Sequence, residues 1–252
     1  QCPTCKDTGY VGDRMCTCQR ELLKDLQREA IRRLAPLDSC TFDSFDTNYY
    51  PETAEDNGIS PRAKADKIAE ACHRYAQRVS LREPANLMLM GQTGLGKTHL
   101  LNAIGNYALV KDPGLKVRYV TSEEFTNEFI DALQNPNQSQ GQIAEFNRRY
   151  RQVDVLLIDD IQFLGGKEAT LDQFFHTFNA LHQANKRIVI ASDVAPKNLK
   201  GFEARLISRF ESGLTVDVKP PDLETRIAIL RMIASMNGSK IPSDVLDLIA
   251  ER

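Results

Sequence analysis

Short apolar runs alternate with amphipathic segments from residue 85 onward. Apolar spacing typical of helices fills 97–110, 122–134 and 171–184. The apolar runs between and around them are Leu87–Met90, Val117–Val120, Val153–Ile158, Ile188–Ala191 and Leu214–Val218. Buried parallel strands joined by crossover helices give this alternation. The pattern predicts a three-layer α/β domain with a five-stranded, mostly parallel sheet.

The remaining segments divide the chain further. Residues 19–35 have an amphipathic helical pattern that ends before Pro36, and Ser60-Pro61 is typical of the first residues of a helix, here 61–79. Residues 134–142 form a predicted polar loop, whereas 222–235 and 243–252 are predicted helices that begin a lid. We therefore expect four parts: a cysteine-rich module (1–20), a helix and linker (21–60), the α/β core (61–219) and a partial helical lid (220–252).

Composition excludes several classes of protein. Of the 252 residues, 42% are hydrophobic and 26% are charged, which fits a soluble globular protein and excludes overall disorder, collagen and a disulfide miniprotein. There is no transmembrane-length apolar run and no signal peptide, so we expect a cytoplasmic protein without a membrane partner. The net charge of -2 gives no dominant basic field, and any contact with nucleic acid should therefore be local.

Four cysteines gather at the start of the chain. Cys2 and Cys5 form a C-x-x-C pair, Cys16 and Cys18 form a C-x-C pair, and the residues between them suggest a short hairpin. Four thiolates can bind Zn²⁺ tetrahedrally, which predicts a module similar to a zinc ribbon. Four reduced surface thiols without metal are the alternative. The isolated Cys40 and Cys72 are expected to be small buried hydrophobic residues.

A phosphate-binding motif follows the first strand of the core. The motif, G-x-x-x-x-G-K-[ST], predicts that backbone N–H groups and a helix N-terminus surround phosphate oxygens. Lys97 would reach the β- and γ-phosphates, and the Thr98 hydroxyl would bind Mg²⁺. The alternative is a glycine-rich turn that binds nothing. The motif consists of Gly91, Gln92, Thr93, Gly94, Leu95, Gly96, Lys97 and Thr98.

Acidic residues end two later strands. Asp159 and Asp160 follow the apolar run at 153–158, at the sheet edge where α/β proteins bind ligands. Asp159 would hold Mg²⁺, directly or through water, and Asp160 would be the base or would orient the attacking water. A strand end with solvated acids is the alternative. Asp193 ends the next strand and could sense the γ-phosphate, or could be a simple capping residue.

Two arginines lie four residues apart on one predicted helix face. Arg205 and Arg209 could offer an arginine finger to the nucleotide of a neighbouring subunit, where it would stabilise charge on the transferring phosphoryl group. A solvated basic face is the alternative.

Longer stretches of the core resemble a known family. Residues from 91 to about 252 closely resemble the AAA+ domain of the DnaA family of bacterial replication initiators. The stretches that carry this resemblance are Gly94–Leu101, Tyr119–Phe125, Asp154–Leu164, Phe174–Asn179 and Pro220–Arg226.

About the first 80 residues are similar to a sister family. The pattern Cys-Pro-x-Cys-x-Asp-Thr-Gly-Tyr at 2–10, the following Cys-x-Cys, Thr41–Phe45 and Gly58–Arg62 resemble helicase loaders of the DnaC/DnaI type. These are AAA+ ATPases whose N-terminal zinc module contacts the replicative helicase. The two resemblances in series are compatible with a divergent natural protein or with a chimera.

The resemblances imply roles for individual residues. Residues 91–98 and the adjoining His99 would bind ATP or ADP, Asp159 and Asp160 would be the Walker B acids, and Asp193 would be the first sensor. Arg209 matches the arginine finger, with Arg205 beside it. Phe42–Phe45 and Ile59 would lie near the adenine. Helix 122–134, including Ile130, would face single-stranded DNA, although Ala169 stands where the family usually has a basic residue.

The implied function is ATP-dependent oligomerisation and slow ATP hydrolysis in replication initiation, with single-stranded DNA and the replicative helicase as partners. The alternatives are an ATP-gated scaffold with negligible turnover and a transposition helper ATPase of the IstB group. The family's second sensor arginine and helix-turn-helix domain would follow residue 252, so this chain alone is not expected to read a duplex origin sequence.

Overall fold

The computed structural model describes residues 2–22, 40–52, 58–78, 86–134, 139–236 and 238–251. Its main sheet has the strand order β4-β5-β6-β3-β7, and every neighbouring pair is parallel. The predicted five-stranded sheet is therefore confirmed and is parallel throughout. Its strands are β3 (Asn86–Met90), β4 (Val117–Thr121), β5 (Val155–Asp159), β6 (Arg187–Ser192) and β7 (Leu214–Asp217).

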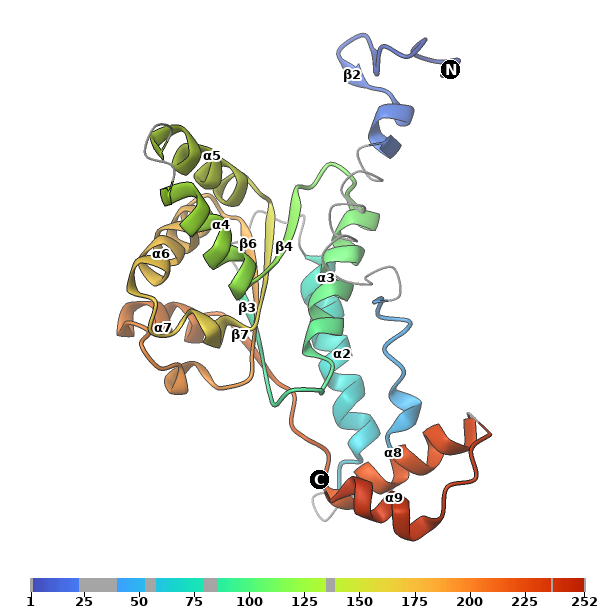
Figure 1. Ribbon diagram of the computed structural model, residues 1–252. Helices are drawn as coiled ribbons and strands as arrows, with labels where there is room; N and C mark the ends of the chain where they lie inside the picture. The colour runs from blue at the N-terminus through green and yellow to red at the C-terminus, as the bar shows by residue number, and fades with distance from the viewer. Residues whose placement is uncertain are drawn as a thin grey trace.

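Helices cover both faces of this sheet, which gives the predicted three layers (Figure 1). The helices α2 (Pro61–Gln77) and α3 (Lys97–Lys111) lie on one face. Alternate strand residues divide between two hydrophobic clusters, one on each face, because successive side chains of a strand point in opposite directions. The other face carries α4 (Ser122–Gln134), α5 (Ser139–Arg151), α6 (Glu168–Gln183) and α7 (Ala204–Glu211).

The prediction of a polar loop over residues 134–142 is wrong at both ends. Gln134 closes α4, and the α5 helix already begins at Ser139. The α5 helix has few apolar residues, but two of them, Phe146 and Tyr150, lie four positions apart and pack edge-on against Phe125 of α4. Tertiary packing of this narrow apolar face explains a helix whose polar sequence gave little signal.

The lid and the N-terminal module are smaller units. In residues 220–252, the predicted lid, α8 (Leu223–Met236) is followed by α9 (Ser243–Ala250). In the module, β1 (Tyr10–Val11) pairs antiparallel with β2 (Arg14–Met15), which matches the expected hairpin. Residues 17–22 are helical, and the rest of the helix expected at 19–35 lies outside the described residues. Within the described part of the chain, no helix has both the length and the apolar character needed to cross a bilayer.

The two isolated cysteines differ in burial. Cys72 is fully buried in the cluster beneath α2 and α3, as expected. Cys40 is only half-buried, so the expectation that it is a buried hydrophobic residue is wrong. Cys40 lies on a segment at the edge of α3, where it packs near Leu109 and its carbonyl oxygen accepts a 2.8 Å hydrogen bond from the Asn106 amide.

Candidate nucleotide and metal sites

The loop between β3 and α3 lies close to the backbone of two other segments, one at the end of β6 and one after β7. The Gly91 N–H donates a 3.1 Å hydrogen bond to the Ser192 carbonyl oxygen at the end of β6. A Cβ atom on Gly91, whose φ is +147°, would lie 2.1 Å from the Val218 carbonyl oxygen. Glycine is therefore needed at the start of the loop because two other backbone segments approach it. The loop ends at Gly96, and Lys97 opens α3.

Lys97 and Asp193 form an ion pair across this loop. Lys97 is 5% exposed, and its ammonium group donates to the Gln92 carbonyl oxygen and to Asp193 Oδ1, both at 2.8 Å. The Thr93 hydroxyl donates to the other oxygen of Asp193 at 3.1 Å. The structure thus brings the carboxylate at the end of β6 to the loop, as the sequence predicted for strand ends at one sheet edge.

Thr98 and Asp159 provide two oxygen atoms side by side. The Thr98 hydroxyl donates a 2.7 Å hydrogen bond to Asp159 Oδ2, and the Asp159 side chain is almost fully buried. A hydroxyl next to a carboxylate is a donor set that Mg²⁺ accepts, usually with waters completing its coordination. These two residues therefore fit the predicted metal site.

Tyr119 of β4 also contacts this pair and was not singled out from the sequence. Its buried hydroxyl donates to Asp159 Oδ2 at 3.3 Å, and burial together with the Asp159 charge raises the pKa of the phenol. The hydroxyl therefore stays protonated and remains a donor. No local sequence signal identifies Tyr119, because its contact depends on β4 lying directly beside β5 in the sheet.

Asp160 stands just beyond the strand in a left-handed backbone conformation, with φ +55°. Burial and the neighbouring Asp159 carboxylate raise the pKa of Asp160, and a hydrogen bond from Gln162 opposes this rise. The Gln162 amide nitrogen donates to Asp160 Oδ1 at 3.2 Å. Asp160 therefore lies among the other acidic residues as a partly buried carboxylate.

His99 points towards a preceding segment. Its Nε2 atom lies 2.8 Å from the Thr41 carbonyl oxygen and 3.3 Å from the Ser44 hydroxyl. The Phe45 ring centre is 5.6 Å from the imidazole, and a Cβ atom on Gly96 would lie 3.1 Å from this phenyl ring. We call residues 40–46 the α3 strap, because they run along α3 and reach the phosphate loop.

The two candidate finger arginines lie on α7. The Arg209 guanidinium is 3.4 Å from Nδ1 of His182 on α6, and burial and this guanidinium lower the pKa of His182, which leaves the ring neutral. Arg205 stacks on the Phe175 ring at 3.8 Å. Among the described residues, no hydrogen bond joins either guanidinium to residues 91–98.

The four N-terminal thiols meet at one point. Their sulfur atoms all lie within 4.8 Å of one another, including Cys2 and Cys16 at 3.8 Å and Cys5 and Cys18 at 3.3 Å. Tetrahedral zinc with Zn–S distances of about 2.3 Å needs sulfur separations of about 3.8 Å. Backbone N–H groups of Cys5 and Thr4 lower the pKa of Cys2 to about 6, which favours the thiolate that zinc binds.

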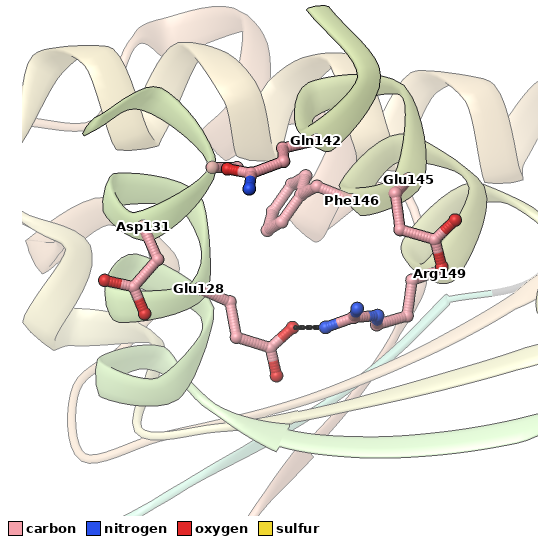
Figure 2. A pocket seen from close by; sticks show the side chains of 7 residues that line it. Glu128, Asp131, Gln142, Glu145, Phe146 and Arg149 are labelled. Carbon is pink, nitrogen blue, oxygen red and sulfur yellow. Dashed lines mark hydrogen bonds and ion pairs between the residues drawn. The ribbon is translucent and has the colours of Figure 1, made fainter. Parts of the chain in front are cut away.

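A hollow of about 400 Å³ lies between α4 and α5. Figure 2 shows the Phe146 ring between the two helices and the ion pair of Glu128 with Arg149, which is 3.0 Å long. Glu128 also binds Arg118 of β4 at 2.7 Å. Asp131 and Glu145 add two further carboxylates to the lining. The acidic lining makes this hollow unsuited to nucleic-acid phosphates.

The fold and the site together define a class of protein. A parallel sheet in this strand order, with a phosphate loop after β3 and acidic residues at the ends of β5 and β6, is that of an AAA+ P-loop NTPase. The family model of the bacterial DnaA ATPase domain matches residues 61–217, which is more than half of the chain. The chain therefore belongs to this family.

Individual relatives agree with this assignment. The chromosomal replication initiator protein DnaA of Bifidobacterium animalis subsp. lactis is 62% identical over 190 residues, which cover 71% of this chain and 33% of that protein. The chain thus spans about a third of the length of the curated relatives it matches. The match to the crystal structure of domain III of Thermotoga maritima DnaA has a TM-score of 0.66 at 38% identity and covers 86% of this chain and 82% of that one.

Two further structures extend the comparison. A replication initiator DnaA bound to AMPPCP and single-stranded DNA matches with a TM-score of 0.60 and 36% identity, over 73% of this chain and 55% of that one. The crystal structure of DnaI matches with a TM-score of 0.50 and 22% identity, over 62% of this chain and 84% of that one. The second likeness shows a shared fold, and the resemblance of the first 80 residues to helicase loaders remains a prediction.

Proposed function

We propose that this chain binds ATP with Mg²⁺ at the loop before α3 and hydrolyses it slowly. The observation that carries the proposal is two sets of contacts at adjacent residues: Asp193 bonds to Lys97 and to Thr93 of the loop, and Thr98 bonds to Asp159. Lys97 and the loop N–H groups would bind the phosphates. Thr98 and Asp159 would hold Mg²⁺, which supplies charge neutralisation of the phosphate oxygens when it is bound.

Asp160 and Asp193 would have separate roles in hydrolysis. Asp160 would orient the attacking water and accept its proton, because it lies outside the Thr98–Asp159 pair that would hold the metal. Asp193 would exchange its contact with Lys97 for a position facing the γ-phosphate. The Asp160 carboxylate accepts its hydrogen bond from Gln162 and the Asp159 carboxylate accepts from Thr98, so the proposed water-orienting group and the proposed metal ligands have different partners.

Calorimetry tests nucleotide binding directly. We expect heat of association with Mg²⁺ and either ATP or ADP, and we expect Lys97→Ala to weaken binding about 100-fold, because it removes a buried charge contact to the phosphates. The exposed Lys111, at the other end of α3, supplies the matched control Lys111→Ala. A folded sample that gives no heat with either nucleotide would overturn the proposal.

At the level of the cell, we infer a role in the initiation of DNA replication through an ATP-dependent oligomer. Membership of the DnaA family supports this inference, as does the related initiator that binds single-stranded DNA. By the resemblance to the initiator family, DNA would contact α4, where Ile130 is 39% exposed. Stimulation of ATP hydrolysis by single-stranded DNA is the expected result.

The partner protein needs a separate experiment. We infer that the N-terminal module recognises the replicative helicase, because its cysteine pattern resembles that of helicase loaders. A pull-down of the helicase with and without ATP tests this inference. Tight nucleotide binding with no measurable turnover in any condition would instead favour an ATP-gated scaffold.

We also propose that Cys2, Cys5, Cys16 and Cys18 bind one Zn²⁺ ion. The convergence of all four sulfur atoms within 4.8 Å supports this site. The thiols crowd one another: hydrogen bonds with Cys5 and Cys2 raise the pKa of Cys18. A divalent cation would offset the repulsion that otherwise opposes ionisation of all four.

A further inference from the structure

The side chain of Gln162 connects the ends of β5 and β6. Its amide nitrogen donates to Asp160 Oδ1 at 3.2 Å and to Asp193 Oδ2 at 3.1 Å. Its amide oxygen accepts a 3.2 Å hydrogen bond from the Asp193 backbone N–H. One carboxamide therefore contacts both acids that would face the γ-phosphate.

The backbone around Gln162 is firmly held. Gln162 lies in the short helix η3 (Ile161–Leu164), which follows the left-handed turn at Asp160. Ile161 and Leu164 are fully buried in the cluster below α4 and α6. With these two anchors packed into the core, Gln162 is directed towards the end of β6 and its rotation is restricted.

The chemistry of the position suits a primary amide. Asp159, Asp160 and Asp193 place three carboxylates near one another, and the Lys97 ammonium contacts Asp193 on its other oxygen. An amide supplies two N–H donors and one acceptor without adding charge. A glutamate would replace donors by a fourth carboxylate, and an apolar side chain of equal length would leave the acids without these hydrogen bonds.

We propose that Gln162 is a positioning residue for ATP hydrolysis, whose carboxamide fixes the Asp160 carboxylate relative to Asp193. This inference rests on the proposed function, because it requires a nucleotide between these acids and the phosphate loop. The Gln162 side chain bonds to Asp160 and Asp193. In the described hydrogen-bond network it bonds to neither Lys97 nor Thr98. Its loss should therefore affect turnover more than nucleotide binding.

The test uses the whole chain with Gln162→Met, which keeps the length of the side chain without hydrogen bonding or charge. We expect kcat to fall about 10- to 100-fold, as for a small displacement of a reacting group. The dissociation constant for a non-hydrolysable ATP analogue should change less than about two-fold. Affinity for ADP with aluminium fluoride, a mimic of the transferring phosphoryl group, should fall together with kcat.

Two further variants make the result decisive. Gln162→Glu preserves the shape, so a role in packing alone predicts full activity, whereas the positioning role predicts a loss at least as large as in Gln162→Met. Gln183→Ala, at an exposed end of α6, should leave all constants unchanged. If the wild-type chain neither binds nor hydrolyses ATP, the proposed function fails. If the wild-type chain turns over ATP and Gln162→Met does so equally fast, the inference on Gln162 alone is overturned.

Discussion

Asp160 combines a left-handed backbone with a carboxylate, and one substitution can remove the charge while keeping the backbone conformation. Its backbone is left-handed, with φ +55°, and burial next to Asp159 raises the pKa of its carboxyl group. Asparagine tolerates the left-handed region as well as aspartate does, and its side-chain oxygen can still accept the hydrogen bond from Gln162. Asp160→Asn therefore changes the charge and leaves the local geometry in place.

We expect Asp160→Asn to stabilise the nucleotide-free protein at pH 7 while abolishing hydrolysis. A raised pKa means that the ionised group is less favourable in the folded state than in the unfolded chain. The wild-type protein therefore loses this part of its stability as the pH rises through the folded pKa, and the neutral variant does not. Thermal unfolding in magnesium-free buffer should show a gain for the variant at pH 7 that shrinks towards pH 4.

The exposed Asp66 on α2 supplies a control for this measurement. Asp66→Asn removes one exposed carboxylate from another part of the molecule and so measures the effect of the change in net charge alone. An Asp160→Asn protein that is no more stable than the wild type at either pH would show that the carboxylate is adequately solvated or paired.

Single residues differed in how far the sequence could place them. Lys97, Thr98, Asp159 and Asp160 belong to local motifs whose spacing fixes their chemistry, and the structure brings them together with Asp193. Tyr119 and Gln162 contact the same acids through strand order and a short turn. Such contacts depend on tertiary register, which no local pattern encodes.

The α3 strap is attached to its helix by side chains two turns apart. His99 binds the Thr41 carbonyl oxygen at 2.8 Å, and Asn106 binds the Cys40 carbonyl oxygen at the same distance. Phe45 then lies against Gly96, the last residue of the loop before α3. The strap thus links the segment behind the cysteine module to the loop that would bind phosphate.

We expect His99→Ala to release the strap and to leave the core folded. The variant loses a side chain–backbone hydrogen bond, which costs about 1 kcal/mol, so the melting temperature of the core should change little. Amide hydrogen exchange of residues 40–46 should become faster, whereas exchange in β3 and β5 should not change. Lys111→Ala on the same helix should affect neither segment, and unchanged exchange of the strap in His99→Ala would show that His99 does not hold it.

Removal of the metal should unfold the cysteine module and leave the α/β core folded. The backbone hydrogen bonds of the module, such as that of the Cys16 N–H to the Gly9 carbonyl oxygen, join residues within the module. Its two-residue strands are too short to be stable alone. Chelation of zinc should therefore abolish exchange protection over residues 2–22 and leave the core transition unchanged.

Elemental analysis by mass spectrometry supplies the stoichiometry, and one zinc per chain is expected. Cys5→Ser should lower this value and mimic chelation, whereas Cys72→Ser should leave the zinc content intact. A well-folded sample without zinc, whose residues 2–22 are nonetheless protected, would contradict the site.

The elements that sequence patterns predicted best are those with strong periodicity. The five strands appear within one or two residues of their predicted ends. The strongest signal comes from β3, β5 and β6, which are buried over almost their whole length. The sequence gives little signal for the α5 helix, because its apolar face is reduced to a few residues that pack on α4. Its helical state follows from that packing and from the ion pair between Arg149 and Glu128.

On the scale of the whole molecule, the position of Arg209 bears on how the proposed ATP site would obtain an arginine finger. The guanidinium lies against His182 of α6, and hydrogen bonds to the phosphate loop are absent among the described residues of the same chain. As the arginine finger that the family resemblance implies, Arg209 would stabilise the transferring phosphoryl group on a second copy of the chain. Such head-to-tail contact uses two different surfaces of each subunit and builds a ring or a helix.

This arrangement predicts complementation between two inactive variants. Arg209→Ala should bind ATP but hydrolyse it slowly, and Lys97→Ala should fail to bind ATP but still offer its own Arg209. In an equal mixture, about a quarter of the interfaces would pair an intact ATP site with an intact arginine, if the subunits associate at random. The mixture should therefore recover about a quarter of the wild-type rate per subunit, and this rate should increase with protein concentration.

The matched control replaces Lys97→Ala in the mixture by the double variant Lys97→Ala with Arg209→Ala, which offers no arginine and should give no recovery. Arg205→Ala combined with Lys97→Ala should still complement, because Arg205 stacks on Phe175 and pairs with acids of its own chain. A mixture whose rate equals the sum of the separate variants at every concentration would exclude an arginine supplied in trans, because no interface in that mixture would then contain a complete site. Calorimetry on Arg209→Ala completes the argument, since undiminished ATP binding would show that the arginine serves turnover and leaves binding to Lys97 and the loop.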